Sequence, residues 1–517
     1  MKRFMSIMLV VLMATTTIFA GGSSEKAEVD PNAPVDLLVL FETQAVEVDP
    51  DGAVVKAIND RFNCNINAWE LDPAKWYEQL NVRIAGGELP DAFVAESTGM
   101  IPSYVEGGIA AEVPIEYIRE KAPHYAAAID KYAPNAWDAT AYNGKNYGFS
   151  QPMAVYPMAV YWNKNWLDAV GRDVPTTLEE MEDVLLAFVN EDPDGNGKKD
   201  TAGMAERMFN AVFGAYGVRC VTGGSTGFKV EEMQLDENGY PFFPYIRPEA
   251  KEALALLHKW YDMGIIDKEF VTGENRGGFV WFSHSFMNQK IGCTTAQVSH
   301  YFMTEDDNYD PGNMGRCMKE FRKMDPNARV VIGPAPIGPE GKSGTEGWAP
   351  IGKTIIFTQN VKDDPRKLDA ILALLEAFYA DPDFALLLSY GEKGVDWEMT
   401  EYGLHRINDG AALRRKGCIQ FAFGNTMQFA ADNRKAQHEF STKVAPKGYY
   451  REIIPSVPEY SNTIATLTTL TEQAYFDIIT GTKPIDYFDT YVDMFNKAGG
   501  AAAEKALRRA IDESRKN

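Results

Sequence analysis

The 517-residue sequence has few of the residues that build thiol and metal centres. It has five cysteines, at positions 64, 220, 293, 317 and 418, and no two of them have CxxC or zinc-ligand spacing. It has six histidines, which are scattered and form no HExxH motif. The odd number of cysteines leaves at least one thiol unpaired. We therefore expect five buried apolar residues with at most one disulfide, whose pairing the spacing does not assign.

The composition also excludes disorder and a nucleic-acid partner. Apolar residues make up 45% of the chain and charged residues 24%, so it can bury a large core and is long enough for two domains. The formal net charge is -22, and no cluster of Lys and Arg is present to displace counterions from phosphates. A soluble, acidic protein is expected, with two domains or one very large domain.

The first residues have the pattern of a secretory signal peptide, which we place at residues 1–20. Lys2 and Arg3 precede an apolar run at 7–13, and Ala20 supplies the small residue at the cleavage site. A polar leader follows at 21–34. Gly21 stands where a lipoprotein needs cysteine, so the sequence predicts release into the periplasm or the extracellular medium. The alternative, a permanent anchor, is disfavoured by the short apolar run, which threonines interrupt at 15–17.

Apolar periodicity predicts alternating strands and helices. The N-terminal region reads as a strand at 35–41, a helix at 53–62, a strand at 66–71, a helix at 76–84 and a strand at 92–95. Such repeated units imply a mostly parallel sheet whose functional edge lies at the carboxyl ends of the strands, here residues 42–44 and 96–98. Asn143-Gly144 predicts the turn of a hairpin at 142–149. Later strands are predicted at 291–295, 330–332 and 353–357, and later helices at 254–261, 365–379, 463–479, 486–497 and 501–514.

Residues 192–201 have the oxygen spacing of a calcium loop. A helix at 178–190, capped by Thr176 or Thr177, leads into it. The expected ligands are the side chains of Asp192, Asp194, Asn196 and Asp200, the carbonyl of Lys198 and the hydroxyl of Thr201. Gly203 stands where an EF-hand places its bidentate Glu, so affinity is expected to be reduced. The alternative is a solvated Asp/Gly turn that binds no ion.

Four motifs in order resemble a known family. They are Gly-Glu-Leu-Pro-Asp at 87–91, Asn-Gly-Lys-Asn-Tyr-Gly at 143–148, Tyr-Trp-Asn-Lys-Asn-Trp-Leu at 161–167 with Val-Pro-Thr-Thr-Leu-Glu-Glu at 174–180 before the calcium loop, and Tyr-Gly-Glu-Lys-Gly-Val at 390–395. Together they resemble the extracellular solute-binding proteins of bacterial ABC importers, in the carbohydrate-binding group that includes alginate-binding and lipo-oligosaccharide-type receptors. The resemblance spans residues 35–500. In the family's calcium loop a Glu follows the last Asp, where this chain has Thr201.

The resemblance implies a periplasmic-binding-protein-like fold of two α/β lobes with a hinge and a solute in the cleft between them. We place lobe one at residues 35–149 plus about 349–415, and lobe two at 150–348 plus about 416–517, with the calcium loop in lobe two. Crossings are expected near 149–152 and 348–352, with a third between about 410 and 430. The implied protein is a monomer that is not an enzyme. It binds structural calcium and an oligosaccharide, which it delivers to an ABC permease.

Sugars stack on aromatic rings and bond to polar side chains, so we expect the site in loops at strand ends and crossings. The candidates are Gln44, Glu96, Tyr147, Trp281, Gln297, Trp348, Trp397, Phe423 and Arg434. Two alternatives stay open. A secreted glycoside hydrolase or lyase would need a pair of carboxylates facing one cleft, and no motif singles out such a pair among the 73 acidic residues. A receptor of the same fold for a basic peptide would also suit the acidic charge.

Overall fold

The computed structural model describes residues 30, 32–43, 46–72, 75–95, 97–153, 156–221, 228, 230, 233–272, 283–297, 315–348, 350–400, 403–408, 410–423, 448–449 and 452–515. The chain divides into two units, residues 1–34 and 35–517. In the first unit only a short turn is described, in which the Asp30 carboxylate accepts a hydrogen bond from the Asn32 amide at 2.9 Å. The predicted signal peptide lies outside the described residues.

The first sheet of the second unit has the strand order β2-β1-β3-β13-β6. Its strands are β1 (Val35–Leu40), β2 (Cys64–Asn67), β3 (Ala92–Val94), β6 (Gly148–Pro152) and β13 (Ile351–Phe357). Strands β2 and β3 pair parallel to β1, whereas β13 pairs antiparallel to both β3 and β6. Gly148 is needed where β6 meets β13, because a Cβ there would lie 1.9 Å from the Ile355 carbonyl oxygen.

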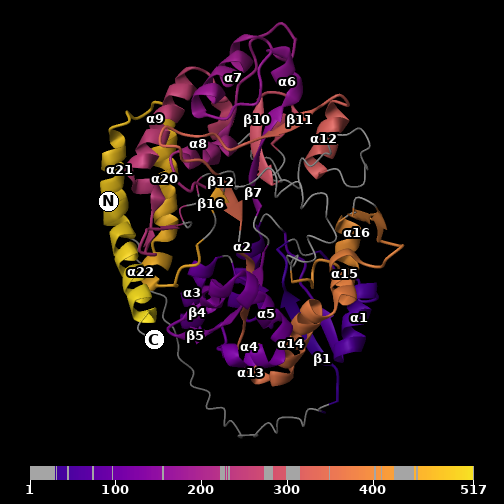
Figure 1. The fold of residues 1–517 in the computed structure, drawn as a ribbon. Helices are drawn as coiled ribbons and strands as arrows, with labels where there is room; N and C mark the ends of the chain where they lie inside the picture. The colour runs from indigo at the N-terminus through magenta and orange to yellow at the C-terminus, as the bar shows by residue number, and fades with distance from the viewer. Residues whose placement is uncertain are drawn as a thin grey trace, which may run out of the picture. The chain divides into compact units, whose positions relative to one another are not determined.

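Helices and two hairpins complete this lobe (Figure 1). The helices are α1 (Ala53–Phe62), α2 (Trp76–Ala85), α3 (Ile101–Glu106), α4 (Ile115–Lys121), α5 (Pro123–Tyr132), α13 (Asn360–Asp363), α14 (Pro365–Ala380), α15 (Pro382–Tyr390) and α16 (Gly410–Arg415). One hairpin joins β4 (Ala141–Tyr142) to β5 (Lys145–Asn146), and the other joins β14 (Trp397–Thr400) to β15 (Gly403–Arg406). At the first turn Asn143 and Gly144 have φ of 51° and 72°, as the predicted Asn-Gly turn requires.

The second sheet has the order β10-β7-β12-β16, and β11 also pairs with β7. Its strands are β7 (Tyr156–Asn163), β10 (Cys293–Gln297), β11 (Val330–Gly333), β12 (Thr345–Trp348) and β16 (Gly448–Tyr449). The remaining elements are α6 (Lys164–Ala169), α7 (Leu178–Asn190), α8 (Phe209–Ala215), α9 (Pro248–Asp262), α10 (His284–Met287), α12 (Arg316–Met324), α19 (Pro458–Ser461), α20 (Ile464–Ile479), α21 (Tyr487–Phe495), α22 (Ala501–Ser514) and the hairpin of β8 (Gln234–Leu235) and β9 (Pro241–Phe242).

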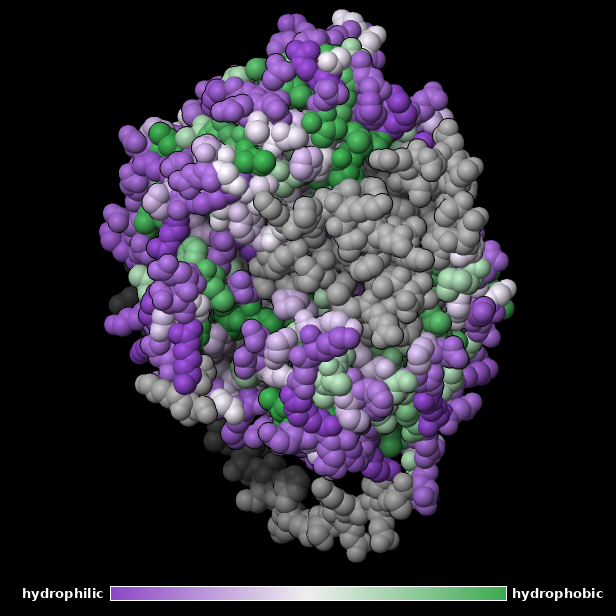
Figure 2. Space-filling view, viewed as in Figure 1, coloured by the Kyte–Doolittle hydropathy of each residue, from purple (hydrophilic) through white to green (hydrophobic). Residues whose placement is uncertain are grey.

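Each sheet has its own hydrophobic core. One core takes residues from 35–149 and 351–423, and the other takes residues from 159–328 and 454–507. The structure is therefore a two-lobed α/β fold, as predicted. On the face seen in Figure 2 the described surface is mostly hydrophilic, and the exposed large apolar residues are few. Among the described helices none is long and apolar enough to span a membrane.

Two sequence predictions need correction. The expected parallel pairing holds for β1 with its neighbours, but β7 pairs antiparallel with β10, β11 and β12. The reason is that β13 and β7 enter their sheets from the other lobe and so run against their neighbours. The second correction concerns the boundary near residue 416, because Cys418, Phe421 and Phe423 pack in the first core rather than the second. All five cysteines are free and buried, so the optional disulfide is not formed.

Candidate functional site

The two lobes are joined by chain segments that lie side by side. Residues 153–155 lead from β6 to β7, and residues 349–350 lead from β12 to β13. The Met153 amide donates to the Pro350 carbonyl at 2.9 Å. Strand pairing continues on both sides of this bond, with Trp348 opposite Tyr156 and Ile351 opposite Pro152. The described residues of the two crossings therefore pair as a two-stranded ribbon, which is named the crossing ribbon below.

A half-buried ion pair lies on the first sheet beside this ribbon. Glu42 follows the carboxyl end of β1, and Lys353 is the third residue of β13, which starts at the same edge because it runs antiparallel to β3. The Lys353 Nζ lies 2.5 Å from the Glu42 Oε2, and the two side chains are 30% and 13% exposed. The Glu42 Oε1 also accepts a hydrogen bond from the Thr43 amide at 2.8 Å.

The environment keeps Glu42 ionised. Burial raises the pKa of Glu42, but the Lys353 charge and hydrogen bond, the Thr43 amide and the Arg414 charge together lower it below its ordinary value. Burial lowers the pKa of Lys353, and the Arg414 charge adds to that effect. Arg414, on α16, is therefore close to both groups, and its Nε is buried without a hydrogen-bond partner. The edge of lobe one thus presents two cations and one carboxylate beside the crossing ribbon.

Lobe two also places buried charges near the ribbon. Arg219 is 3% exposed, and its guanidinium donates to the carbonyl oxygens of Tyr449 at 3.1 Å and Gly347 at 3.5 Å. Gly347 precedes the last residue of β12, so Arg219 lies at the lobe-two end of the ribbon. Glu346 is 4% exposed and belongs to the same strand. Charged groups from both lobes therefore flank the crossing ribbon.

The structure places several of the predicted ligand-binding aromatic residues inside the protein. Tyr147 is 7% exposed and packs in the first core. Trp397 is 4% exposed, and its indole N–H donates to the Gly391 carbonyl at 2.9 Å. Phe423 is fully buried, with ring centroids 4.9 Å from Phe41 and 5.7 Å from Phe149. None of these three rings presents a free face in this structure.

The other predicted residues are distributed as follows. Gln297 is the half-buried last residue of β10, and it lies opposite Met158. Trp348 ends β12 at the crossing ribbon, as predicted, and its side chain lies outside what the structure describes. Gln44, Glu96, Trp281 and Arg434 also lie outside the described residues. Lys353 was missed, although a lysine within the apolar run 351–357 is a signal that sequence reasoning could have used.

The predicted calcium loop follows α7, whose N-cap is Thr177. The Asn196 amide nitrogen bonds to Asp194 Oδ2 at 2.6 Å and to Asp200 Oδ1 at 3.1 Å, and the Gly197 amide bonds to Asp192 Oδ2 at 3.0 Å. Burial raises the pKa of Asp194, and the nearby Asp192 and Asp200 carboxylates add to this effect. The Asp192 Oδ1 is buried without a hydrogen-bond partner.

The loop has oxygen ligands that suit calcium. The Thr201 hydroxyl is buried and donates its hydrogen to the Phe188 carbonyl at 2.7 Å, which holds the side chain against the end of α7. The Lys198 backbone N–H donates a hydrogen bond to Asn196 Oδ1 at 2.8 Å. The Lys198 carbonyl oxygen is the group expected to bind the ion. Among the described residues no group of three or more His, Cys, Asp or Glu side chains is arranged to hold a metal.

Two short strings in the sequence match enzyme motifs, and neither has the required context among the described residues. Residues 347–354 have the spacing of a phosphate-binding loop, but Gly352, Lys353 and Thr354 lie within strand β13, whereas that motif requires a helix there. Residues 223–227 have the Gly-x-Ser-x-Gly spacing of a nucleophile elbow and lie outside the described residues. The first match is therefore a coincidence of spacing.

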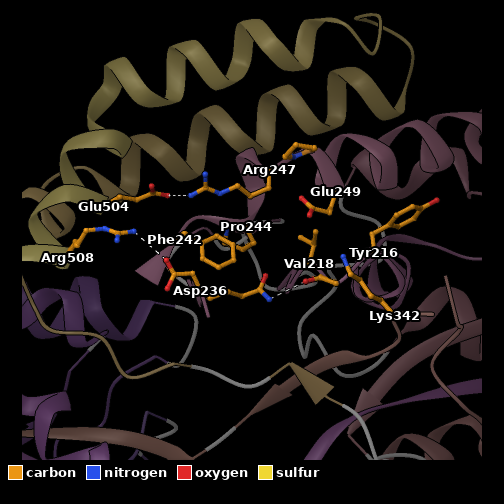
Figure 3. Close-up of a pocket in the computed structure, with 13 residues that line it drawn as sticks. Tyr216, Val218, Asp236, Phe242, Pro244, Arg247, Glu249, Lys342, Glu504 and Arg508 are labelled. Atoms are coloured by element: carbon orange, nitrogen blue, oxygen red, sulfur yellow. Dashed lines mark hydrogen bonds and ion pairs between the residues drawn. The ribbon is translucent and has the colours of Figure 1, made fainter. Parts of the chain in front are cut away.

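A separate cavity of about 480 Å³ lies within lobe two (Figure 3). It is bounded by the β8–β9 hairpin, the start of α9, residues 216–218 and α22. Arg247 bonds to Glu504 at 2.9 Å and Arg508 bonds to Asp236 at 3.4 Å on its rim. None of its lining residues belongs to the crossing ribbon.

With this geometry established, comparison with known proteins identifies the family. Residues 53–383 match the family model of the bacterial extracellular solute-binding proteins, which covers more than half of the chain. The chain belongs to this family. Its members are binding proteins rather than enzymes.

Two relatives and two solved structures show how far the likeness extends. Lipoprotein LipO of Bacillus subtilis (strain 168) is 23% identical over 542 residues, which cover 99% of both chains. Polygalacturonan/rhamnogalacturonan-binding protein YtcQ of the same organism is 25% identical over 418 residues, covering 77% of this chain and 75% of YtcQ. The alginate-binding protein AlgQ2, solved without calcium ion, has a TM-score of 0.66 at 18% identity, covering 93% of this chain and 98% of AlgQ2. FusA of S. pneumoniae in complex with kestose has a TM-score of 0.64 at 17% identity, covering 94% and 100%. At these identities the solved structures establish the fold alone.

One relative corrects the predicted localisation. The presence of Gly21 in place of a lipid-bearing cysteine predicted a freely released protein. LipO aligns over 99% of this chain and of its own length, and it is named a lipoprotein. This finding contradicts the prediction of free release.

Proposed function

We propose that this solute-binding protein is the carbohydrate receptor of an ABC importer and that it acts as a monomer. The observation that carries the proposal is the crossing ribbon, with Glu42, Lys353 and Arg414 on one lobe and Arg219 and Glu346 on the other. Charged side chains bond strongly to hydroxyl groups, and groups from both lobes allow one solute to bridge them. Relatives named for polygalacturonan, rhamnogalacturonan and fructooligosaccharide support an oligosaccharide as the solute.

Binding of a bridging solute would close the two lobes. Rotation at the crossing ribbon needs changes in few backbone angles, and a ligand drives closure only by its higher affinity for the closed form. The permease of the importer would then recognise the closed form. Trp348, at the end of β12, is the proposed stacking platform.

The test is a thermal-shift and calorimetric screen of the purified protein against neutral and uronic oligosaccharides, with basic peptides as controls. An oligosaccharide at about a hundred times its Kd should stabilise the protein by roughly 2.7 kcal/mol. Trp348→Ala should weaken its binding by roughly 1 to 3 kcal/mol, the cost of losing a stacking ring. Tight binding of peptides alone would favour the peptide receptor. Cleavage of the saccharides during the titration would favour the hydrolase or lyase.

Closure itself is tested by small-angle scattering. The radius of gyration should fall when the oligosaccharide identified in the screen is added to saturation, because closing the lobes compacts the protein. An unchanged radius at saturation would refute the closure step while leaving the binding assignment intact.

We propose in addition that the loop at 192–201 binds a structural calcium ion. The unpartnered Asp192 Oδ1 and the mutually repelling Asp192, Asp194 and Asp200 carboxylates support this role, because a cation would relieve both costs. The ion would hold the end of α7 and would not touch the solute. Metal analysis of gently purified protein should find calcium, and EDTA should lower the melting temperature. A calcium-free protein with an EDTA-independent melting temperature would refute the proposal.

A further inference from the structure

The cavity within lobe two is lined by groups that recognise a small polar molecule (Figure 3). Its volume of about 480 Å³ falls in the range of small-molecule sites, roughly 300 to 1,000 Å³. The Phe242 ring and Pro244 lie in its middle, and Val218 and Tyr216 continue this wall towards one end. The Arg247 guanidinium lies over the Phe242 ring, 5.1 Å from its centroid, so a sugar ring would have to use the opposite side of this ring together with the rest of the apolar wall.

The charges around the cavity are balanced. Arg247, Lys342 and Arg508 supply three cations, and Asp236, Glu249 and Glu504 supply three carboxylates. Arg247 is paired with Glu504, Arg508 with Asp236, and Lys342 with Glu340 at 2.8 Å. Each of the three cations therefore already has a carboxylate partner, and an anionic ligand would have to displace one of these partners and would be repelled by Glu249. A cationic ligand would be attracted by Glu249 but repelled by the three cations. A neutral ligand leaves the existing ion pairs intact.

Hydrogen-bonding capacity of both kinds remains in the described contacts: Arg247, Arg508 and Lys342 keep N–H donors beyond their ion pairs, and two carboxylates keep acceptor positions. Glu249, in the first turn of α9, makes no hydrogen bond or ion pair with the described part of the chain, and Figure 3 shows its carboxylate directed towards the cavity. Within the described part of the chain, the contacts of Glu504 fall on its Oε1, which accepts from the Phe243 amide at 2.8 Å and from Arg247 at 2.9 Å. Asp236 is already engaged by the Asn238 and Tyr240 amides at 2.9 Å each. Two carboxylates therefore remain to accept hydrogen bonds from hydroxyl groups.

We propose that this cavity is a second saccharide site, which takes a neutral mono- or disaccharide. A sugar ring supplies both a flat CH face for Phe242 and hydroxyl donors for Glu249 and Glu504. The choice of saccharide as the ligand class rests on the proposed function. The site itself rests on the cavity and lies on lobe two alone, so it does not require lobe closure.

The test uses isothermal titration of the full chain with sucrose and maltose, with digalacturonate as an anionic probe and choline as a cationic probe. Glu249→Gln removes the carboxylate charge and should weaken disaccharide binding about tenfold, because a hydrogen bond to a charged acceptor is lost. Phe242→Leu should weaken it by a similar factor by removing the aromatic face. Glu252→Gln is the matched control, because this exposed residue of α9 does not line the cavity. It should bind like the unaltered protein.

The same titrations separate this proposal from the proposed function. A saccharide bound at the crossing ribbon loses affinity in Trp348→Ala and keeps it in Glu249→Gln, whereas one bound in the cavity shows the reverse. Crystals soaked in maltose should show the sugar against Phe242. The proposal is overturned if Glu249→Gln and Phe242→Leu leave disaccharide affinity unchanged, if the charged probes bind there more tightly, or if binding occurs at crystal concentration only.

Discussion

Replacing Lys353 by Met should destabilise lobe one by about 2 kcal/mol at pH 7. Removing one partner of a fully buried ion pair costs roughly 3 to 5 kcal/mol, because the remaining charge is left without compensation. The expected cost here is smaller for two reasons. Lys353 is 30% exposed, so water screens the pair, and the Arg414 charge remains near Glu42.

The pH dependence identifies the cause of this loss. The folded-state pKa of Glu42 lies below its ordinary value, so the pair contributes stability above the unfolded-state pKa, and that contribution is lost as the pH falls through the folded-state pKa. Lys353→Met removes the charge and the hydrogen bond that lower the pKa of Glu42. Burial remains, and burial raises this pKa. Below the ordinary pKa of Glu, about 4.3, the carboxyl group becomes protonated, and the difference between the variant and the unaltered protein should shrink.

Urea unfolding followed by tryptophan fluorescence at pH 7 and pH 3.5 measures both effects. The double variant Glu42→Gln with Lys353→Met removes both charges and should recover most of the loss. Lys362→Met is the matched control, because Lys362 is exposed on α13, and its effect should stay within about 0.5 kcal/mol. A Lys353→Met protein as stable as the original at pH 7, or a deficit that persists unchanged at pH 3.5, would refute the reasoning.

Three further changes test the local assignments. Thr177→Ala removes the N-cap that accepts from the Glu180 amide at 3.1 Å, and chemical unfolding should show a loss of about 1 kcal/mol, whereas no loss would contradict the cap. Phe423→Ala should cost roughly 3 to 5 kcal/mol in the same assay, because its ring is fully buried, and a stable protein with lost saccharide affinity would instead support stacking. Asp200→Asn should abolish the stabilisation by calcium, about 1.4 kcal/mol for each tenfold rise in free calcium above Kd, and retention of this response would exclude Asp200 as a ligand.

Local elements were predictable because their signals are local. The helix at 53–62 is α1 (Ala53–Phe62), in which Val54, Val55 and Ile58 are buried at helical spacing. The helix at 178–190 is α7 with the expected Thr177 cap, and the Asn143-Gly144 turn has the expected positive φ angles. Each of these features is decided by a few neighbouring residues, so the sequence is sufficient.

Pairing between lobes and the exposure of aromatic rings were not predictable in this way. Whether β13 runs with or against β3 depends on which lobe the chain has just left, and no local pattern records that. Trp397 and Phe423 follow loops, as ligand-stacking residues often do, but the partners that bury them are distant in sequence, such as Phe41 and Phe149 for Phe423. An aromatic residue's position in sequence does not reveal whether its face is free.

Lys353 shows both a local sequence signal and a contact that the sequence does not reveal. Its charge interrupts an otherwise apolar strand, which the sequence shows, but its partner Glu42 lies more than 300 positions earlier and is found only by folding. Lys353 is also three residues after Pro350, whose carbonyl accepts the hydrogen bond from Met153 that joins the two crossings. A solute that bonds to this ion pair therefore contacts the strand that continues into the crossing ribbon. The proposed solute contact and the proposed hinge both lie on β13. A substitution at the ion pair is therefore expected to change lobe closure as well as solute affinity.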